Sequence, residues 1–340
     1  MIKKILGTAF LVAILIAAYY GFNLYNTIYG SAVKQDTYLY IPTGSSYQEV
    51  LQLIDSTKCI ESISGFDQVA ELKSYPDLVK PGRYLLKKGM SNEEAINKLR
   101  IGTQDPVNFT FNNLRTIQQL AGVASRYFEP DSLSFLDQLT DPKVIKKYGF
   151  NQNQFPSLFI PNTYEMNWNT TAEEFIARMA REYKTFWTPN RQQKARQLNL
   201  SQSDVSTLAS IVESETVKSD EKARVAGVYI NRLQKGMPLQ ADPTLIFALG
   251  DFSIKRVTND DKKIESPYNT YKYKGLPPGP IRLSEISSLE SVLNYERHNF
   301  IYFCAKEDFS GYHNFTSSYR KHRQNARKYQ NALNKRKIYR

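Results

Sequence analysis

Hydrophobic residues are concentrated near the beginning of the chain, in one long run. After Lys3 and Lys4 no charged residue occurs until Lys34, and residues 5–25 are mostly apolar. A bilayer core needs about 20 such residues. The pattern therefore predicts a membrane-spanning helix over residues 5–25, after a cytoplasmic start at residues 1–4. The two lysines ahead of the run favour a cytoplasmic N-terminus, with the remainder of the chain outside.

A cleaved signal peptide is the alternative, because it shares the charged start and the apolar middle. No small-x-small cleavage site follows the run, since Ala17 and Ala18 precede the bulky Tyr19 and Tyr20. Those tyrosines suit the membrane interface, and no cysteine stands there for a lipid anchor. We therefore expect an uncleaved anchor.

Beyond the anchor, short alternating runs typical of strands are each followed by an amphipathic helical pattern. Strands are expected at 38–41, 82–86 and 107–111, and helices at 47–54, 91–102 and 116–127. Ser91 and Glu94 form a capping box that begins the second helix. Small strand–helix units of this kind resemble glycan-binding LysM-type modules. A spacer that holds the following domain away from the membrane is an equal alternative.

The rest of the chain mixes helical and extended patterns. Residues 130–200 are mostly helical, with a polar, proline-bearing patch at 155–165. Further helices are expected at 203–216, 221–234 and 318–335, and a strand at 300–304. These patterns predict an α+β protein with one transmembrane helix, a small LysM-like α/β module at residues 35–104, and a mixed α+β domain at residues 105–340 that ends in a basic helix.

The charge of the chain is unevenly distributed. The 340 residues carry a net charge of +12, but nine positive charges lie after Phe309, where no acidic residue occurs. Subtracting nine leaves about +3 for the rest, so a basic nucleic-acid groove across the fold is not supported. Two cysteines, Cys59 and Cys304, cannot form a disulfide framework, and whether they pair is open. Three widely spaced histidines give no metal motif, and no metal or organic cofactor is expected.

The helix at 203–216 carries the strongest candidate for catalysis. A capping box of Ser201 and Asp204 begins it, one face is apolar, and Glu213 and Glu215 end it. At ~100° per residue, Glu215 lies nearer the centre of the apolar face and Glu213 at its edge. Partial burial raises a carboxyl pKa and makes a general acid near neutral pH. Solvated carboxylates at a helix end are the alternative.

Two loop-like stretches suggest the wall of a cleft. Residues 240–244 follow a helix stop at Gly236, and residues 266–280 combine prolines and glycines with polar and aromatic groups. Such rigid backbone is typical of a preformed site, although it is equally typical of a well-ordered structural loop.

Seven sequence blocks, in order, resemble one family, the endolytic murein transglycosylases or YceG-like proteins. The blocks are 158–164, 208–216, 231–233, 236–244, 268–271, 275–281 and His313-x-Phe315. The chain departs from the family pattern at Asn162, where Asp is usual, and at Phe247, where Tyr is usual. It departs again at Ser284-Glu285, where Asn-Pro would follow the Pro-Gly-Pro turn.

The resemblance implies a catalytic role for the first glutamate, Glu213, whereas the helical count favours Glu215. We therefore expect Glu213 to be the catalytic residue, as the resemblance implies. The substrate-binding candidates are Gln240, Asp242, Thr244, Tyr268, Asn269 and Tyr164.

The resemblance also implies a reaction and a location. The reaction is non-hydrolytic cleavage of MurNAc–GlcNAc bonds in peptidoglycan, leaving 1,6-anhydroMurNAc ends on nascent strands. The enzyme would sit in the inner membrane and face outward, with cell-wall synthases and division proteins as partners. Two alternatives stay open: a non-catalytic glycan-binding scaffold of the division machinery, and a hydrolytic muramidase that pairs Glu213 with a second carboxylate such as Asp242.

Overall fold

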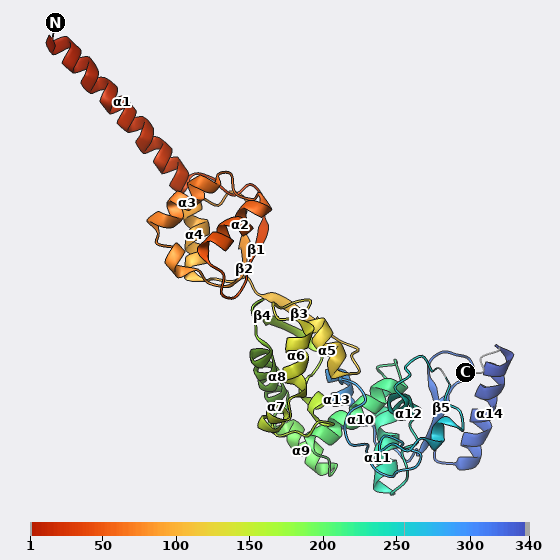
Figure 1. Cartoon of the computed structure of the whole chain (residues 1–340). Helices are drawn as coiled ribbons and strands as arrows, with labels where there is room; N and C mark the ends of the chain where they lie inside the picture. The colour runs from red at the N-terminus through yellow and green to blue at the C-terminus, as the bar shows by residue number, and fades with distance from the viewer. Residues whose placement is uncertain (1, 255, 337–340) are drawn as a thin grey trace. The chain divides into compact units, whose positions relative to one another are not determined.

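The computed structural model describes residues 2–254 and 256–336, and the chain forms two compact units (Figure 1). The first comprises residues 1–109, 127–130 and 165–171, and the second comprises 110–126, 131–164 and 172–340. The first unit thus includes three short segments that the sequence analysis assigned to the C-terminal domain, namely 105–109, 127–130 and 165–171. The domain borders drawn from the sequence stay a prediction.

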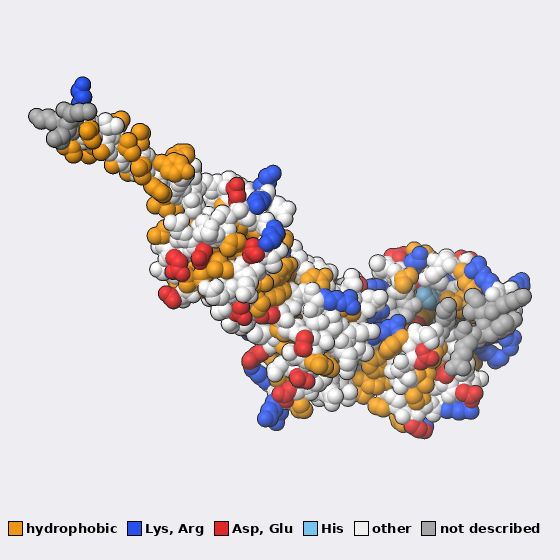
Figure 2. Space-filling model, turned by 45° about the horizontal axis from the view of Figure 1, so that its top comes forward, with side chains coloured by type: hydrophobic (Ala, Val, Ile, Leu, Met, Phe, Trp, Pro, Cys, Tyr) orange, Lys and Arg blue, Asp and Glu red, His pale blue; other side chains and the backbone are white. Residues whose placement is uncertain are grey.

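The first unit begins with the long helix α1 (Ile2–Tyr29). Its apolar side chains are exposed (Figure 2), and an 18-residue window within Lys4–Tyr29 has a mean hydropathy of 2.1. The predicted apolar helix is therefore confirmed, and it is longer than residues 5–25. Its end packs on the module that follows, where Asn92 donates a 2.8 Å hydrogen bond to the Thr27 carbonyl.

The module after α1 combines a two-stranded antiparallel sheet with helices. Strands β1 (Thr37–Ile41) and β2 (Gly82–Leu86) pair in the register Thr37↔Leu86, and their alternate side chains are buried. The helices are α2 (Tyr47–Thr57), α3 (Ile63–Leu72) and α4 (Asn92–Ile101), with a short 3₁₀ turn at Pro76–Leu78. The capping box of Ser91 and Glu94 is present as predicted. Helix α3 was missed by the sequence analysis.

The second unit is mainly helical. Strands β5 (Tyr302–Ala305) and β6 (His313–Thr316) form a two-stranded sheet in it. Strands β3 (Val107–Phe111) and β4 (Asn162–Met166) form another two-stranded sheet, whose residues are divided between the two units. The helices before the site are α5 (Ile117–Ala124), α6 (Ser132–Thr140), α7 (Pro142–Lys147), α8 (Ala172–Phe186) and α9 (Pro189–Gln197). Those that follow are α10 (Gln202–Glu215), α11 (Lys222–Gln234), α12 (Asp242–Leu249), α13 (Ile286–Leu293) and α14 (Tyr319–Lys335).

Helix α10 lies at the centre of this unit and packs against α9, α11, α12 and α13 (Figure 1). Every residue from Val205 to Glu213 is buried, whereas the sequence analysis assigned it a single apolar face. Its buried hydroxyls explain the difference. Ser206, Thr207 and Ser210 donate to carbonyls three or four residues earlier in the helix, so their polar groups are satisfied in the core.

Two stretches described as loops or patches from the sequence contain regular structure. The 155–165 patch contains a 3₁₀ turn (Phe155–Leu158) and strand β4, and α12 begins at Asp242 with Pro243 in its first turn. Proline suits that position because the first helical N–H has no partner within the helix. The mixed α+β class is confirmed. Cys59 and Cys304 are free thiols in different units.

Candidate active site

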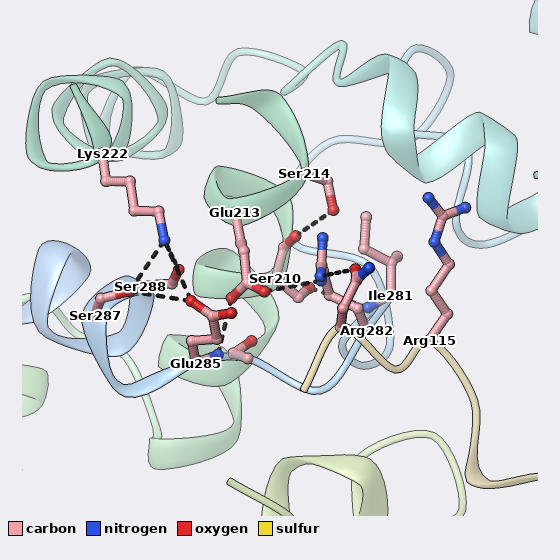
Figure 3. Close-up of polar contacts among 12 residues, drawn as sticks. Arg115, Ser210, Glu213, Ser214, Lys222, Ile281, Arg282, Glu285, Ser287 and Ser288 are labelled. Atoms are coloured by element: carbon pink, nitrogen blue, oxygen red, sulfur yellow. Dashed lines mark hydrogen bonds and ion pairs between the residues drawn. The ribbon is translucent and has the colours of Figure 1, made fainter. Parts of the chain in front are cut away.

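The two glutamates that end α10 lie in different surroundings. Glu213 is only 8% exposed, and its Oε1 lies 3.0 Å from Nε of Arg282 (Figure 3). Its Oε2 accepts a 2.8 Å hydrogen bond from the backbone N–H of Glu285. Both contacts come from the segment that precedes α13, and the contact with Arg282 is an ion pair that lacks hydrogen-bond geometry.

The side chain of Glu285 extends this network toward α11. Its Oε2 lies 3.8 Å from Nζ of Lys222, a buried lysine that also donates 3.0 Å hydrogen bonds to Ser287 and Ser288 (Figure 3). Lys222 therefore links the first turn of α11 to the first turn of α13. Since a buried charge is costly without partners, these contacts fix the ends of three helices around Glu213.

The loop before α5 joins the same network. Arg282 donates a 2.6 Å hydrogen bond to Oδ1 of Asn113, and the Leu283 N–H donates to the Leu114 carbonyl at 2.9 Å. On the other side of the segment, the Ile281 N–H donates to the buried Ser210 hydroxyl of α10 at 3.0 Å. Residues 281–285 therefore run in a fixed path between α10 and the loop at 113–115.

Glu215, two residues further along, has a tyrosine rather than an arginine as its partner. The Tyr229 hydroxyl of α11 donates a 2.6 Å hydrogen bond to its Oε1. Burial, together with the charge of Asp242, raises the pKa of Glu215 to about 7, although the hydrogen bond from Tyr229 and the charge of Arg232 lower it. A carboxyl with this pKa is partly protonated near neutral pH, as a general acid must be.

Asp242 and Tyr271 form a second polar pair next to Glu215. The Tyr271 hydroxyl donates a short hydrogen bond to Asp242 at the start of α12, and both groups interact electrostatically with Glu215. Partial desolvation raises the pKa of Asp242, whereas the hydrogen bond from Tyr271 and the charge of Lys262 lower it. Two carboxyl groups with raised pKa values in one site are typical of acid–base chemistry.

Arg232 holds the backbone around this pair. Its buried guanidinium donates 2.7 Å hydrogen bonds to the carbonyls of Leu239 and Ile301. Gln240 follows with a left-handed φ of 53°, and its N–H donates to the Thr270 carbonyl at 3.0 Å. The two loop-like stretches identified in the sequence, 240–244 and 266–280, are thereby joined next to Glu215.

The structure separates the substrate-binding candidates by exposure. Gln240 and Asp242 are exposed, and Tyr268 is half-buried against the ring of Phe247 at 4.8 Å. Thr244 and Asn269 are fully buried.

The buried candidates bond to their own loops. Thr244 donates to Ala241, and Asn269 donates to Lys262 and Ile264. Tyr164 is also buried, and its hydroxyl donates to the Ile160 carbonyl. Only the exposed candidates present polar groups to solvent in this conformation.

Four residues of the site were absent from the sequence-based candidates, namely Tyr229, Arg232, Tyr271 and Arg282. Three of them lie inside matched blocks or directly beside one: Arg232 in 231–233, Tyr271 in 268–271, and Arg282 after 275–281. Their position in or beside these blocks could have identified them as site residues from the sequence. Tyr229 carried none, because a tyrosine in an amphipathic helix usually belongs to the core.

Comparison with known proteins identifies the class. The family model described as YceG-like matches residues 39–328. A Bacillus subtilis protein named endolytic murein transglycosylase is 30% identical over 310 residues, covering 86% of this chain and 85% of its own. A Streptococcus pneumoniae protein of the same name is 29% identical over 300 residues, covering 78% of this chain but 53% of its own.

A solved structure agrees with these matches. The crystal structure of a YceG-like protein from Listeria monocytogenes is 27% identical, with a TM-score of 0.58, and covers 85% of this chain and 98% of its own. The chain belongs to the YceG-like family. The resemblance found from the seven sequence blocks is confirmed.

One departure from the family pattern bears on the site. Glu285 stands where the pattern noted above has proline, and proline has no backbone N–H. The 2.8 Å hydrogen bond from Glu285 to Glu213 therefore depends on that departure.

Proposed function

We propose that the chain is a membrane-anchored endolytic transglycosylase of peptidoglycan. It cleaves MurNAc–GlcNAc bonds within glycan strands, leaves 1,6-anhydroMurNAc ends, and acts on nascent strands during wall synthesis. The observation that carries the proposal is the Glu215 carboxyl, which has a pKa near 7 and lies beside Asp242 and Tyr271. The names of the B. subtilis and S. pneumoniae relatives support the same substrate.

In this mechanism Glu215 supplies the proton. The protonated carboxyl gives its proton to the glycosidic oxygen as the bond to C1 of MurNAc breaks. The resulting carboxylate then takes the proton of the C6 hydroxyl while that oxygen closes on C1. One group serves as acid and then as base, so the reaction needs no added water. The hydrogen bond from Tyr229 orients the carboxyl for both steps.

Glu213, the residue expected from the resemblance, is the alternative proton donor. Its Oε1 forms an ion pair with Arg282, and its Oε2 accepts a hydrogen bond from the Glu285 N–H. We therefore assign Glu213 to positioning the end of α10, and a matched pair of variants described below decides between the two glutamates.

The exposed candidates line the approach to Glu215 in this proposal. Gln240 and Asp242 orient sugar hydroxyls, and the half-buried ring of Tyr268 stacks on a sugar face. Thr244 and Asn269 are positioning residues that hold these loops. Tyr164 has no direct role in this conformation.

Hydrolysis is a second candidate reaction, because Asp242 lies close enough to Glu215 to raise its pKa. In that reaction Asp242 would stabilise or activate the attack on C1, and the product would be a reducing end. Mass spectrometry of sacculi digested with the purified protein distinguishes the candidates. Anhydro ends support transglycosylation, reducing ends support a muramidase, and binding without released products supports the non-catalytic scaffold.

We further propose that α1 anchors the protein in the inner membrane, with its N-terminus in the cytoplasm. The module at 35–104 would act as a LysM-like glycan-binding unit, with wall synthases and division proteins as partners. The exposed apolar surface of α1 supports the anchor. Deleting residues 1–25 should move the protein from the membrane fraction to the soluble fraction, and unchanged membrane association would contradict the anchor.

A further inference from the structure

Arg115 is a positive charge beside an ion pair that is already complete. It lies on the loop before α5, with Arg282 between it and Glu213 in Figure 3. None of the ion pairs among the described residues includes Arg115. Its guanidinium instead packs over the ring of Phe252, 4.4 Å from the ring centroid, and the side chain is half-buried.

The position of Arg115 is fixed by its neighbours in the chain. Asn113 accepts a hydrogen bond from Arg282, and the Leu114 carbonyl accepts one from Leu283. The same Arg282 pairs with Glu213 in α10. The loop that carries Arg115 is therefore tied directly to the segment that ends beside Glu213, two residues from Glu215.

The charges around Arg115 do not balance. Glu213 neutralises Arg282, and Glu285 lies opposite Lys222, which leaves Arg115 as the extra positive charge. Burial, and then the charge of Arg282, lower the pKa of Arg115. The two guanidinium charges therefore repel each other unless an anion is added. A group with one or two negative oxygens would relieve that repulsion.

The proposed substrate carries such groups. The stem peptides on MurNAc contain free carboxylates, and a guanidinium binds a carboxylate through two parallel N–H donors. The contact with Phe252 covers one face of the guanidinium plane, and the N–H groups lie in that plane.

We propose that Arg115 binds a carboxylate of the stem peptide and so makes the enzyme prefer glycan that carries charged stems. This inference rests on the proposed function, because it needs the glycan strand to lie along the site around α10. Arg115 is then a specificity residue, and it takes no part in bond cleavage.

The test uses the full-length protein in detergent with three uncrosslinked substrates. The first carries native stems, the second carries stems whose carboxylates have been converted to amides, and the third is stripped of stems. Wild-type KM should be about tenfold lower for native than for amidated stems, with kcat unchanged. Arg115→Gln should remove that difference, and Arg115→Lys should retain part of it because it keeps the charge. Arg126→Gln, an exposed arginine just past α5, is the matched control and should behave as wild type.

Three results would overturn the proposal. The first is an equal wild-type KM for native and amidated stems. The second is an equal rise in KM on both substrates in Arg115→Gln. The third result would be an equally low KM for stripped and native glycan that Arg115→Gln raises equally. In that case Arg115 binds the free lactyl carboxylate of MurNAc and not the stem peptide. Failure of the proposed function gives a separate result, because the wild type would then release no anhydro ends from any substrate.

Discussion

The Tyr229 hydroxyl and the Glu215 carboxylate are joined by a 2.6 Å hydrogen bond between α11 and α10. Glu213, two residues earlier on α10, is joined to Arg282 at 3.0 Å instead. Two glutamates on one helical turn thus have different partners, a tyrosine hydroxyl at Glu215 and an arginine guanidinium at Glu213. We propose that this difference places proton transfer at Glu215 and structural anchoring at Glu213.

Replacing each glutamate by glutamine separates these roles. Glu215→Gln should lower the rate of glycan cleavage by about 10²- to 10⁴-fold, because the amide cannot donate and recover a proton. Glu213→Gln should retain more activity but unfold at a lower temperature, because it leaves Arg282 buried without a charged partner. Product release from sacculi and thermal unfolding by circular dichroism measure the two effects. If Glu213→Gln is inactive with a wild-type melting temperature while Glu215→Gln cleaves normally, Glu213 is the acid.

The pH dependence of cleavage tests the surroundings of Glu215. With a pKa of about 7 the carboxyl loses its proton as the pH rises through neutrality, so the wild-type rate should fall on the alkaline side. Tyr229→Phe removes a hydrogen bond that lowers this pKa, so the falling limb should move to higher pH. Asp242→Asn removes a charge that raises the pKa, so the limb should move to lower pH.

The opposite direction of the two shifts is the diagnostic result. Rates for both variants are measured from pH 5 to 9 at saturating substrate. Shifts in the same direction, or none, would mean that Glu215 is not the titrating group. A variant that lowers the rate equally at every pH has changed substrate binding rather than proton transfer.

Sequence patterns predicted the local features of this site well. The capping box of Ser201 and Asp204 and the helix that ends at Glu215 both depend on neighbouring residues. The ~100° count placed Glu213 at the edge of the apolar face, whereas Glu213 is buried and Glu215 is half-buried. The contacts that distinguish the two glutamates are not local. Arg282 lies 69 positions after Glu213 in the chain, and only the folded path of residues 281–285 brings them together.

The hydrogen bond from Glu285 to Glu213 can be removed without deleting a charged partner of Glu213. Glu285→Pro eliminates the N–H, and the φ of −64° at this position already suits proline. Glu285→Ala keeps the N–H and loses only the side chain. Both variants lose the contact with Lys222, so their difference isolates the backbone donor.

We expect Glu285→Pro to be about 1.5–3 kcal/mol less stable than Glu285→Ala, the usual contribution of a hydrogen bond to a charged group. Urea unfolding of the full chain in detergent measures the difference. Equal stabilities would show that the N–H contributes nothing in solution. Since proline is usual at this position in the family pattern, cleavage activity should persist in both variants.

The burial of helix α10 shows why the fold could be predicted only in part. A periodic pattern identifies the face of a helix that meets one neighbour. Helix α10 has neighbours on all sides, and the hydroxyls of its serines and threonines are bonded to its own carbonyls. Because these polar residues are buried, the sequence pattern predicted a helix with one exposed face. Asp242 was assigned to a loop for a related reason, because Pro243 marks a turn as readily as a helix start.

Gly227 in α11 allows two backbone segments to approach closely, and a matched glycine tests its importance. A Cβ at Gly227 would overlap the Glu296 carbonyl oxygen and lie 2.7 Å from Nε2 of His298, whereas a Cβ at Gly122 in α5 would meet nothing within 4 Å. Both glycines are helical, so alanine gains about 1 kcal/mol of helix propensity at each.

Gly122→Ala should therefore be neutral or stabilising. Gly227→Ala should destabilise by several kcal/mol, because the 296–298 segment must move away from α11, and with it the hydrogen bond from Asn231 to the His298 carbonyl. Unfolding in urea compares the two variants, and similar stabilities would show that α11 and this segment are not in close contact.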